Sequence, residues 1–128
     1  MRRHALIAVF ALSLAACTVA APRPPQTFVI FFTPFSAALD GTGQTVVTTA
    51  AKAASDNPHA GVHVVGFASP VGGAAVNDPL SQTRAQVVVA QLVQDGVAAS
   101  RITVASRGPT DVKLSDVESR RVEIDVGP

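Results

Sequence analysis

The stretch between positions 66 and 85, GFASPVGGAAVNDPLSQTRA, contains one side chain that could hold a small charged ligand. This residue is Arg84, whose planar guanidinium can bind a carboxylate through two parallel hydrogen bonds. The stretch begins at the end of an apolar run, continues through a turn rich in glycine and proline, and ends in a helix-like pattern. This order predicts a small-ligand pocket, in which Arg84 faces the loop.

A strand, a turn and a helix must position Arg84. The apolar run at 61–68 (GVHVVGFA) predicts a strand that ends just before the glycine- and proline-rich turn. Asp78 can cap a helix with its carboxylate, and Pro79 suits a first helical position, where no N–H is needed. We therefore expect a helix from there to about residue 95, with Gly96 as its stop signal and Arg84 in its second turn.

The rest of the chain predicts an α+β domain. The further expected elements are a buried strand at 28–32, a helix capped by Asp40 and ending near Ser55, a strand at 101–105 followed by a turn at 107–109, and an alternating, half-exposed strand at 120–126. The order β-α-β-α-β-β predicts a two-layer sandwich, in which two helices cover one face of a single sheet.

Composition limits the possible functions. The chain has 128 residues, of which 48% are apolar, so it has room for one domain and a short leader. Without Arg2 and Arg3 of the leader, 8 Lys and Arg stand against 9 Asp and Glu, which gives no electrostatic signature of nucleic-acid binding. The single cysteine, Cys17, excludes a disulfide within the chain.

The first 26 residues predict a leader and a tether. Residues 1–16 have a basic start and a short apolar run, as in a signal peptide. Residues 14–17 (LAAC) resemble a bacterial lipobox, which implies lipidation of Cys17; the alternative is an ordinary signal peptide with an incidental cysteine. Residues 17–26 then form a proline-rich tether before a domain at 27–128. Because Thr18 is not an aspartate, similarity to such lipoproteins implies an outer-membrane anchor with the domain facing the periplasm.

Metal binding and catalysis have little support in the sequence. No group of Cys, Asp or His stands at metal-site spacing, and we expect no metal and no cofactor. A triad of Ser69, His63 and Asp111 can be imagined, but no nucleophile-elbow sequence is present. We therefore expect no catalytic residue.

Several separated motifs resemble OmpA-like domains in one register. The similarity covers about residues 27–126. The matching positions are Gly66, Gly72, Asn77, Leu80, Ser81, Arg84, Ala85, Val88, Leu92 and Arg120 to Glu123.

This resemblance implies noncovalent binding of peptidoglycan through its stem peptide. In the family an Asp and a later Arg hold the free amino-acid end of a diaminopimelate residue. Arg84 matches that arginine, but Ser69 stands in place of the acid, which implies weakened recognition. The resemblance thus implies Ser69, Asn77 and Arg84 as the ligand-binding residues. The alternative is a degenerate domain that acts as a structural module or binds envelope proteins, without peptidoglycan. The chain has no Trp or Tyr to stack on sugar rings, which favours the peptide stem as the target.

Overall fold

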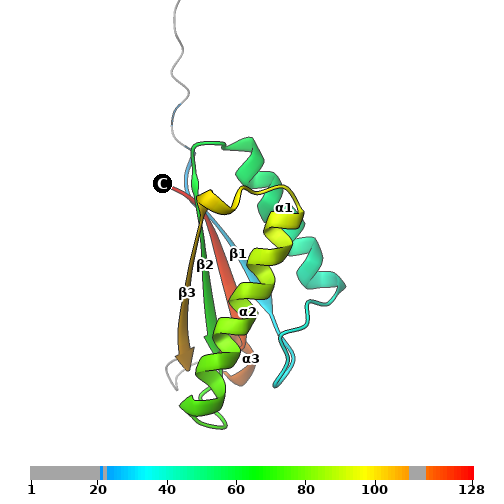
Figure 1. Ribbon diagram of the computed structural model, residues 1–128, viewed down its shortest axis with the longest axis vertical. Coiled ribbons are helices and arrows are strands. Elements are labelled where there is room, and N and C mark those ends of the chain that lie inside the picture. Colours follow the sequence, from blue (N-terminus) through cyan, green and yellow to red (C-terminus); the bar gives the residue numbers. More distant parts are fainter. Residues whose placement is uncertain (1–20, 22, 110–114) are drawn as a thin grey trace, which may run out of the picture.

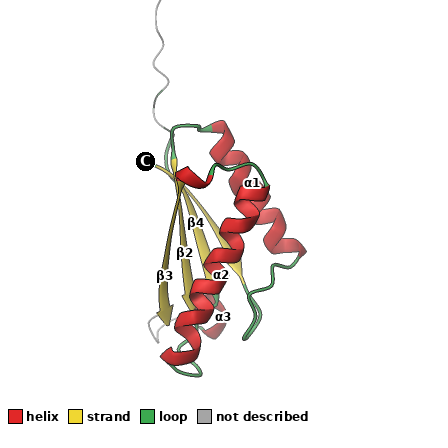
Figure 2. Cartoon of the chain, in the orientation of Figure 1, coloured by secondary structure: helices red, strands yellow, loops and turns green. Residues whose placement is uncertain are grey.

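The computed structural model describes residues 21, 23–109 and 115–128, and within them it has one sheet of four strands and two long helices (Figures 1 and 2). The elements in order are β1 (Gln26–Phe31), α1 (Gly41–Asp56), β2 (Gly61–Ala68), α2 (Ala74–Gln94), the 3₁₀ turn η1 (Ala99–Arg101), β3 (Ile102–Pro109), α3 (Asp116–Ser119) and β4 (Arg121–Gly127). The expected α+β two-layer sandwich is confirmed. The expected signal peptide, Cys17 and Asp111 lie outside the described residues.

The strand order of the sheet is β1-β4-β2-β3. The last strand, β4, is antiparallel to both β1 and β2, whereas β2 and β3 are parallel. Phe31 at the end of β1 therefore pairs with Arg121 at the start of β4, and Gly66 near the end of β2 pairs with Val122. As a result, the segments that follow β1 and β2 meet the segment that precedes β4 at one end of the sheet, where α3 lies in Figure 1.

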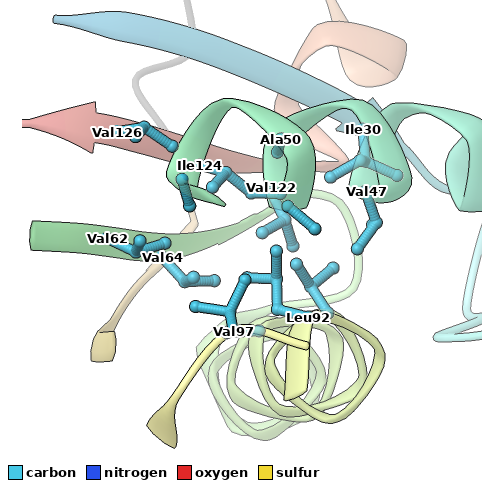
Figure 3. Close-up of a cluster of buried hydrophobic side chains, with 14 of the residues drawn as sticks. Ile30, Val47, Ala50, Val62, Val64, Leu92, Val97, Val122, Ile124 and Val126 are labelled. Atoms are coloured by element: carbon cyan, nitrogen blue, oxygen red, sulfur yellow. The ribbon is translucent and has the colours of Figure 1, made fainter. Parts of the chain in front are cut away.

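Both long helices cover the same face of the sheet, and the core lies between the two layers (Figure 1). The strands alternate, so that every second side chain is buried against the helices. Figure 3 shows these side chains pointing toward one another; they include Ile30, Val62, Val64, Val122, Ile124 and Val126 from the strands, and Val47, Ala50 and Leu92 from the helices. The buried face of α1 consists of glycine, alanine and valine, which lets that helix lie close to the sheet.

Gly66 sets the distance between α2 and β2. A Cβ placed on this glycine would lie 2.2 Å from the backbone carbonyl oxygen of Ser81 and 3.1 Å from the Cβ of Ala85. Only a residue without a side chain therefore allows the helix backbone to approach the strand this closely. This contact fixes the first half of α2 above the end of β2.

The termini of both long helices can be compared with the sequence predictions. Asp40 caps α1 as expected, because its Oδ1 accepts a hydrogen bond from the backbone N–H of Gly43 at 2.6 Å. Gly96 has a φ of 101° just after α2, which confirms it as the stop signal.

The predicted start of α2 at Asp78 and Pro79 is wrong, because the helix begins at Ala74 and contains Pro79. The carbonyl of Gly73 accepts the first helical hydrogen bonds, from the N–H groups of Val76 and Asn77. The buried Asn77 side chain also donates a hydrogen bond to the carbonyl oxygen of Val71 in the preceding loop. These contacts form the first turn before the expected cap is reached.

The predicted turn at residues 107–109 is also wrong. The strand β3 continues to Pro109, whose Cα pairs with that of Ala68 across a register shift in β2. Parallel pairing with β2 therefore keeps these residues extended, and an edge strand tolerates a terminal proline. At the other end of the domain, β1 begins at Gln26, so strand pairing includes the last residue assigned to the tether.

Among the described residues, none of the helices combines the length and the apolar character that crossing a bilayer requires.

Candidate functional site

The structure brings the three predicted ligand-binding residues together. Ser69, Asn77 and Arg84 all line one small pocket of about 80 Å³ at the end of the sheet where β1 and β2 finish. Its other described lining residues are Pro34, Phe35, Val71, Leu80, Asp116 and Arg120. A pocket of this size suits one charged end of a larger ligand; a pocket that encloses a whole drug-sized molecule is typically 300–1,000 Å³.

Arg84 is completely buried, although it carries a charge. Its Nε donates to the carbonyl oxygen of Ser36 at 2.7 Å, and its Nη2 donates to the carbonyl oxygen of Thr33 at 3.0 Å. The guanidinium also lies over the ring of Phe32, with 5.2 Å between Cζ and the ring centroid. The helix α2 therefore directs this cation into the loop that follows β1.

The third nitrogen of the Arg84 guanidinium, Nη1, has no hydrogen-bond partner among the described residues, and it is shielded from solvent. Burial, and to a lesser extent the charge of Arg120, lower the pKa of Arg84 to about 10. Arg84 is therefore still a cation at neutral pH, and its unpaired charge favours an anionic group supplied by a ligand.

Ser69 and Asn77 hold the loop that forms one wall of the pocket. The Ser69 hydroxyl accepts a hydrogen bond from the N–H of Val71 at 3.1 Å, and Asn77 Nδ2 donates to the Val71 carbonyl oxygen at 2.7 Å. The loop then turns through Gly72 and Gly73, whose φ angles are 98° and 84°. At these positive φ angles glycine is strongly favoured. The hydrogen bonds of the Ser69 and Asn77 side chains with the backbone of Val71 fix the loop just before these two glycines.

Sequence reasoning did not assign Asp116 and Arg120 to the site. Arg120 is buried, its Nε donates to the carbonyl oxygen of Phe32 at 3.1 Å, and its Nη1 forms an ion pair with Oδ2 of Asp116. Asp116 begins the short helix α3. The sequence of 115–118 (SDVE) is a capping-box pattern, and this signal could have predicted that helix.

The chemistry of the pocket is that of a site for one charged end of a ligand. Two guanidinium groups, of Arg84 and Arg120, and one carboxylate, of Asp116, line the pocket. Phe35 and Val71 form an apolar rim and are 69% and 62% exposed. This arrangement can hold a carboxylate beside an apolar chain.

A larger open groove of about 580 Å³ lies at the opposite end of the sheet, between α1 and the residues around the start of β1. Its charged lining residues, Arg23, Lys52 and Asp56, are all exposed to solvent. Lys52 and Asp56 neutralise each other in an ion pair. The smaller pocket is therefore the stronger candidate site.

The described residues contain no cluster of three or more His, Cys, Asp or Glu side chains that could hold a metal ion. His63 is exposed on β2, and its Nδ1 forms a hydrogen bond with the hydroxyl of Thr103 on the neighbouring strand.

Comparison with known proteins identifies the family of the domain. Residues 31–122 match the model of the OmpA family. The chain is 34% identical to the probable lipoprotein YiaD of Escherichia coli over 105 residues, which cover 77% of this chain and 48% of YiaD. The chain thus spans about half the length of that relative.

Two solved structures share the fold. The OmpA-like domain of FopA1 from Francisella tularensis superposes with a TM-score of 0.72 and 24% identity, over 80% of this chain and 71% of that one. The peptidoglycan-associated lipoprotein from Burkholderia pseudomallei gives a TM-score of 0.69 and 21% identity, over 77% and 89%. The match over residues 31–122 establishes that the chain is a member of the OmpA family.

Proposed function

We propose that the protein is an outer-membrane lipoprotein whose OmpA-like domain binds peptidoglycan noncovalently through the stem peptide. The observation that carries this proposal is the buried guanidinium of Arg84, whose Nη1 has no partner among the described residues. A carboxylate at the free end of a diaminopimelate residue would supply the missing acceptor. The similarity to a peptidoglycan-associated lipoprotein and to a probable lipoprotein supports the same ligand and the same anchor.

The position of the pocket supports this arrangement. The pocket lies at the end of β1, whereas the chain enters the domain at the start of that strand. Six strand residues separate the two ends by about 20 Å. A domain anchored through Cys17 would therefore direct its pocket away from the membrane that holds it.

Ser69 makes this site weaker than one with the family acid. The hydroxyl can accept a hydrogen bond from an ammonium group but brings no charge. A hydrogen bond to a charged group contributes about 1.5–3 kcal/mol, so its loss weakens binding by about one to two orders of magnitude. The serine at position 69 also favours a second candidate function, in which the domain has lost peptidoglycan binding and acts as a structural or protein-interaction module.

Retention on isolated sacculi distinguishes the two candidates. The fragment 20–128 contains every described element, and we expect sacculi to retain it in a pull-down. Arg84→Ala should abolish retention, whereas Arg107→Ala, which removes an exposed arginine of β3, should not. Circular dichroism must show that both variants are folded. If sacculi retain none of the unaltered fragment but do retain Ser69→Asp, the second candidate is correct.

The lipid anchor has a separate test. Lipidation of Cys17 with several acyl chains would make membrane attachment effectively permanent. We expect the full chain to fractionate with outer membranes and Cys17→Ser to move to the soluble periplasmic fraction. Unchanged fractionation of the variant would contradict the anchor without affecting the peptidoglycan proposal.

A further inference from the structure

The carboxylate of Asp116 lies in the same pocket as Arg84, although Ser69 occupies the position of the family acid. Asp116 is the only acidic residue among the described residues that line the pocket. It comes from α3, before β4, and not from the loop after β2 that carries Ser69. The pocket therefore contains an acid from a different part of the chain.

A capping box and an ion pair position Asp116. The Ser115 hydroxyl accepts a hydrogen bond from the N–H of Glu118 at 3.2 Å, and the Glu118 carboxylate accepts one from the N–H of Ser115 at 3.0 Å. This capping box fixes the short helix that Asp116 begins. The ion pair with Arg120 then holds the carboxylate, and Arg120 is itself bonded to the carbonyl of Phe32.

Asp116 remains available to a ligand. Its side chain is 49% exposed, and the ion pair with Arg120 uses Oδ2. Among the described residues, none forms a hydrogen bond or an ion pair with Oδ1. The neighbouring acids are placed differently, because Asp78 is exposed on α2 outside the pocket and Glu118 is engaged in the capping box.

We infer that Asp116 receives the ammonium group of a bound amino-acid end while Arg84 holds its carboxylate. The ligand class is a peptide whose free end carries an ammonium and a carboxylate on the same carbon. This inference rests on the proposed function, because it specifies how the same pocket recognises the stem peptide. In this arrangement the negative charge that the family has at the position of Ser69 is supplied by Asp116, from another wall of the pocket.

Two synthetic peptides test the inference by titration calorimetry with the fragment 20–128. The first is a stem tripeptide that ends in diaminopimelate, and the second ends in 2-aminopimelate, which lacks only the terminal ammonium. We expect the unaltered protein to bind the first at least about tenfold more tightly. Asp116→Asn should remove this preference by weakening the first peptide alone, and Ser69→Asp added to that variant should restore it. Asp78→Asn, which removes an exposed acid from α2, is the matched control and should bind both peptides as the unaltered protein does.

Each other outcome has a definite meaning. If Asp116→Asn binds both peptides normally while Arg84→Ala binds neither, Asp116 is not the ammonium acceptor and the proposed function stands. If Asp116→Asn weakens both peptides equally, Asp116 only positions Arg120, and the inference is wrong. If the unaltered protein binds neither peptide, both proposals are wrong. Thermal melting of each variant shows whether a loss of binding comes from a loss of folding.

Discussion

Arg84 on α2 donates its Nε to the backbone carbonyl of Ser36 at 2.7 Å, across 48 positions of the sequence. A second hydrogen bond, from Nη2 to the carbonyl of Thr33, joins the same helix and loop. The guanidinium thus connects two parts of the fold while its Nη1 remains unpartnered among the described residues. The same side chain therefore serves both the local structure and the proposed ligand site.

The lowered pKa of Arg84 predicts a particular dependence of stability on pH. In the folded protein the guanidinium loses its proton near pH 10, whereas in the unfolded chain it keeps the proton to higher pH. Above about pH 10 the unfolded state therefore binds more protons, so the contribution of Arg84 to stability rises with pH. We expect the melting temperature of the unaltered protein, minus that of Arg84→Gln, to become more positive between pH 8 and pH 11.

The measurement is a series of thermal melts of the two proteins in matched buffers. Arg107→Gln, which removes an exposed arginine from β3, is the control and should show no such trend. A difference for Arg84→Gln that stays constant across this range would show that burial does not disfavour the Arg84 cation. Binding of a carboxylate ligand should change in the opposite direction, because the cation that attracts it is lost above about pH 10.

Gly66 is predicted to be the glycine of β2 at which a methyl group is most harmful. In Gly66→Ala the new Cβ would lie 2.2 Å from the carbonyl oxygen of Ser81, so the first half of α2 must move away from the sheet. Overpacking of this kind costs about 1–3 kcal/mol. We expect urea denaturation to show a loss of unfolding free energy in this range, and weaker ligand binding because Arg84 moves with the helix.

Gly41→Ala is the matched control for this substitution. No heavy atom lies within 4 Å of a Cβ added there, and Gly41 is the first residue of α1. The unfolding free energy should therefore stay the same or rise by about 0.5–1 kcal/mol, because alanine restricts the unfolded chain. Equal losses in the two variants would contradict the close approach of α2 to β2.

The sequence predicts those parts of the fold whose signals are local. The strand β2 is predicted to the residue, since alternation over 61–68 is bounded by a turn. The Asp40 cap and the Gly96 stop are likewise local signals that the structure confirms. In contrast, Asp78 and Pro79 imitate a helix start, but the contact of Asn77 with the preceding loop decides where α2 begins.

The composition of the pocket could be predicted only in part for the same reason. Ser69, Asn77 and Arg84 come from one continuous stretch, so a motif can identify them together. Asp116 and Arg120 line the pocket because β4, which follows them, pairs between β1 and β2. No local sequence pattern specifies that strand order. Burial of Arg84 likewise depends on the loop after β1, which lies far away in the sequence.

The capping box of α3 predicts a link between a serine outside the pocket wall and ligand binding. Ser115→Ala removes the hydroxyl that accepts from the N–H of Glu118, which typically costs about 1 kcal/mol. We expect faster hydrogen exchange in α3 and weaker binding of the diaminopimelate peptide, because Asp116 is no longer held. Ser100→Ala, an exposed serine of η1, should change neither, and normal binding by Ser115→Ala would show that α3 does not position the acid.

The same capping box predicts that α3 is sensitive to acid. Hydrogen bonds from Ser115, and to a lesser extent the charge of Arg121, hold the pKa of Glu118 below its ordinary value. For an acid with a lowered pKa, the stabilisation is present above the ordinary pKa and is lost as pH falls through the folded-state value. Exchange of the α3 amides, corrected for the intrinsic rate, should therefore become faster at acidic pH in the unaltered protein but not in Glu118→Gln.

Asn77→Ala is predicted to loosen the wall of the pocket without unfolding the domain. The amide is 2% exposed, and its Nδ2 donates to the carbonyl of Val71 at 2.7 Å, so its loss removes one of the two side-chain bonds that hold the loop before α2. A buried hydrogen bond contributes about 0.5–1.5 kcal/mol, and the exposed loop can hydrate the freed carbonyl, so the loss of stability should stay within this range. Because the ligand must then order the loop, the affinity for the diaminopimelate peptide should fall several-fold.

Hydrogen exchange of residues 69–73 measures the loosening of the loop in Asn77→Ala, and Gln82→Ala, at an exposed position of the same helix, is the control. Unchanged exchange in Asn77→Ala would show that Ser69 alone is sufficient to fix this wall.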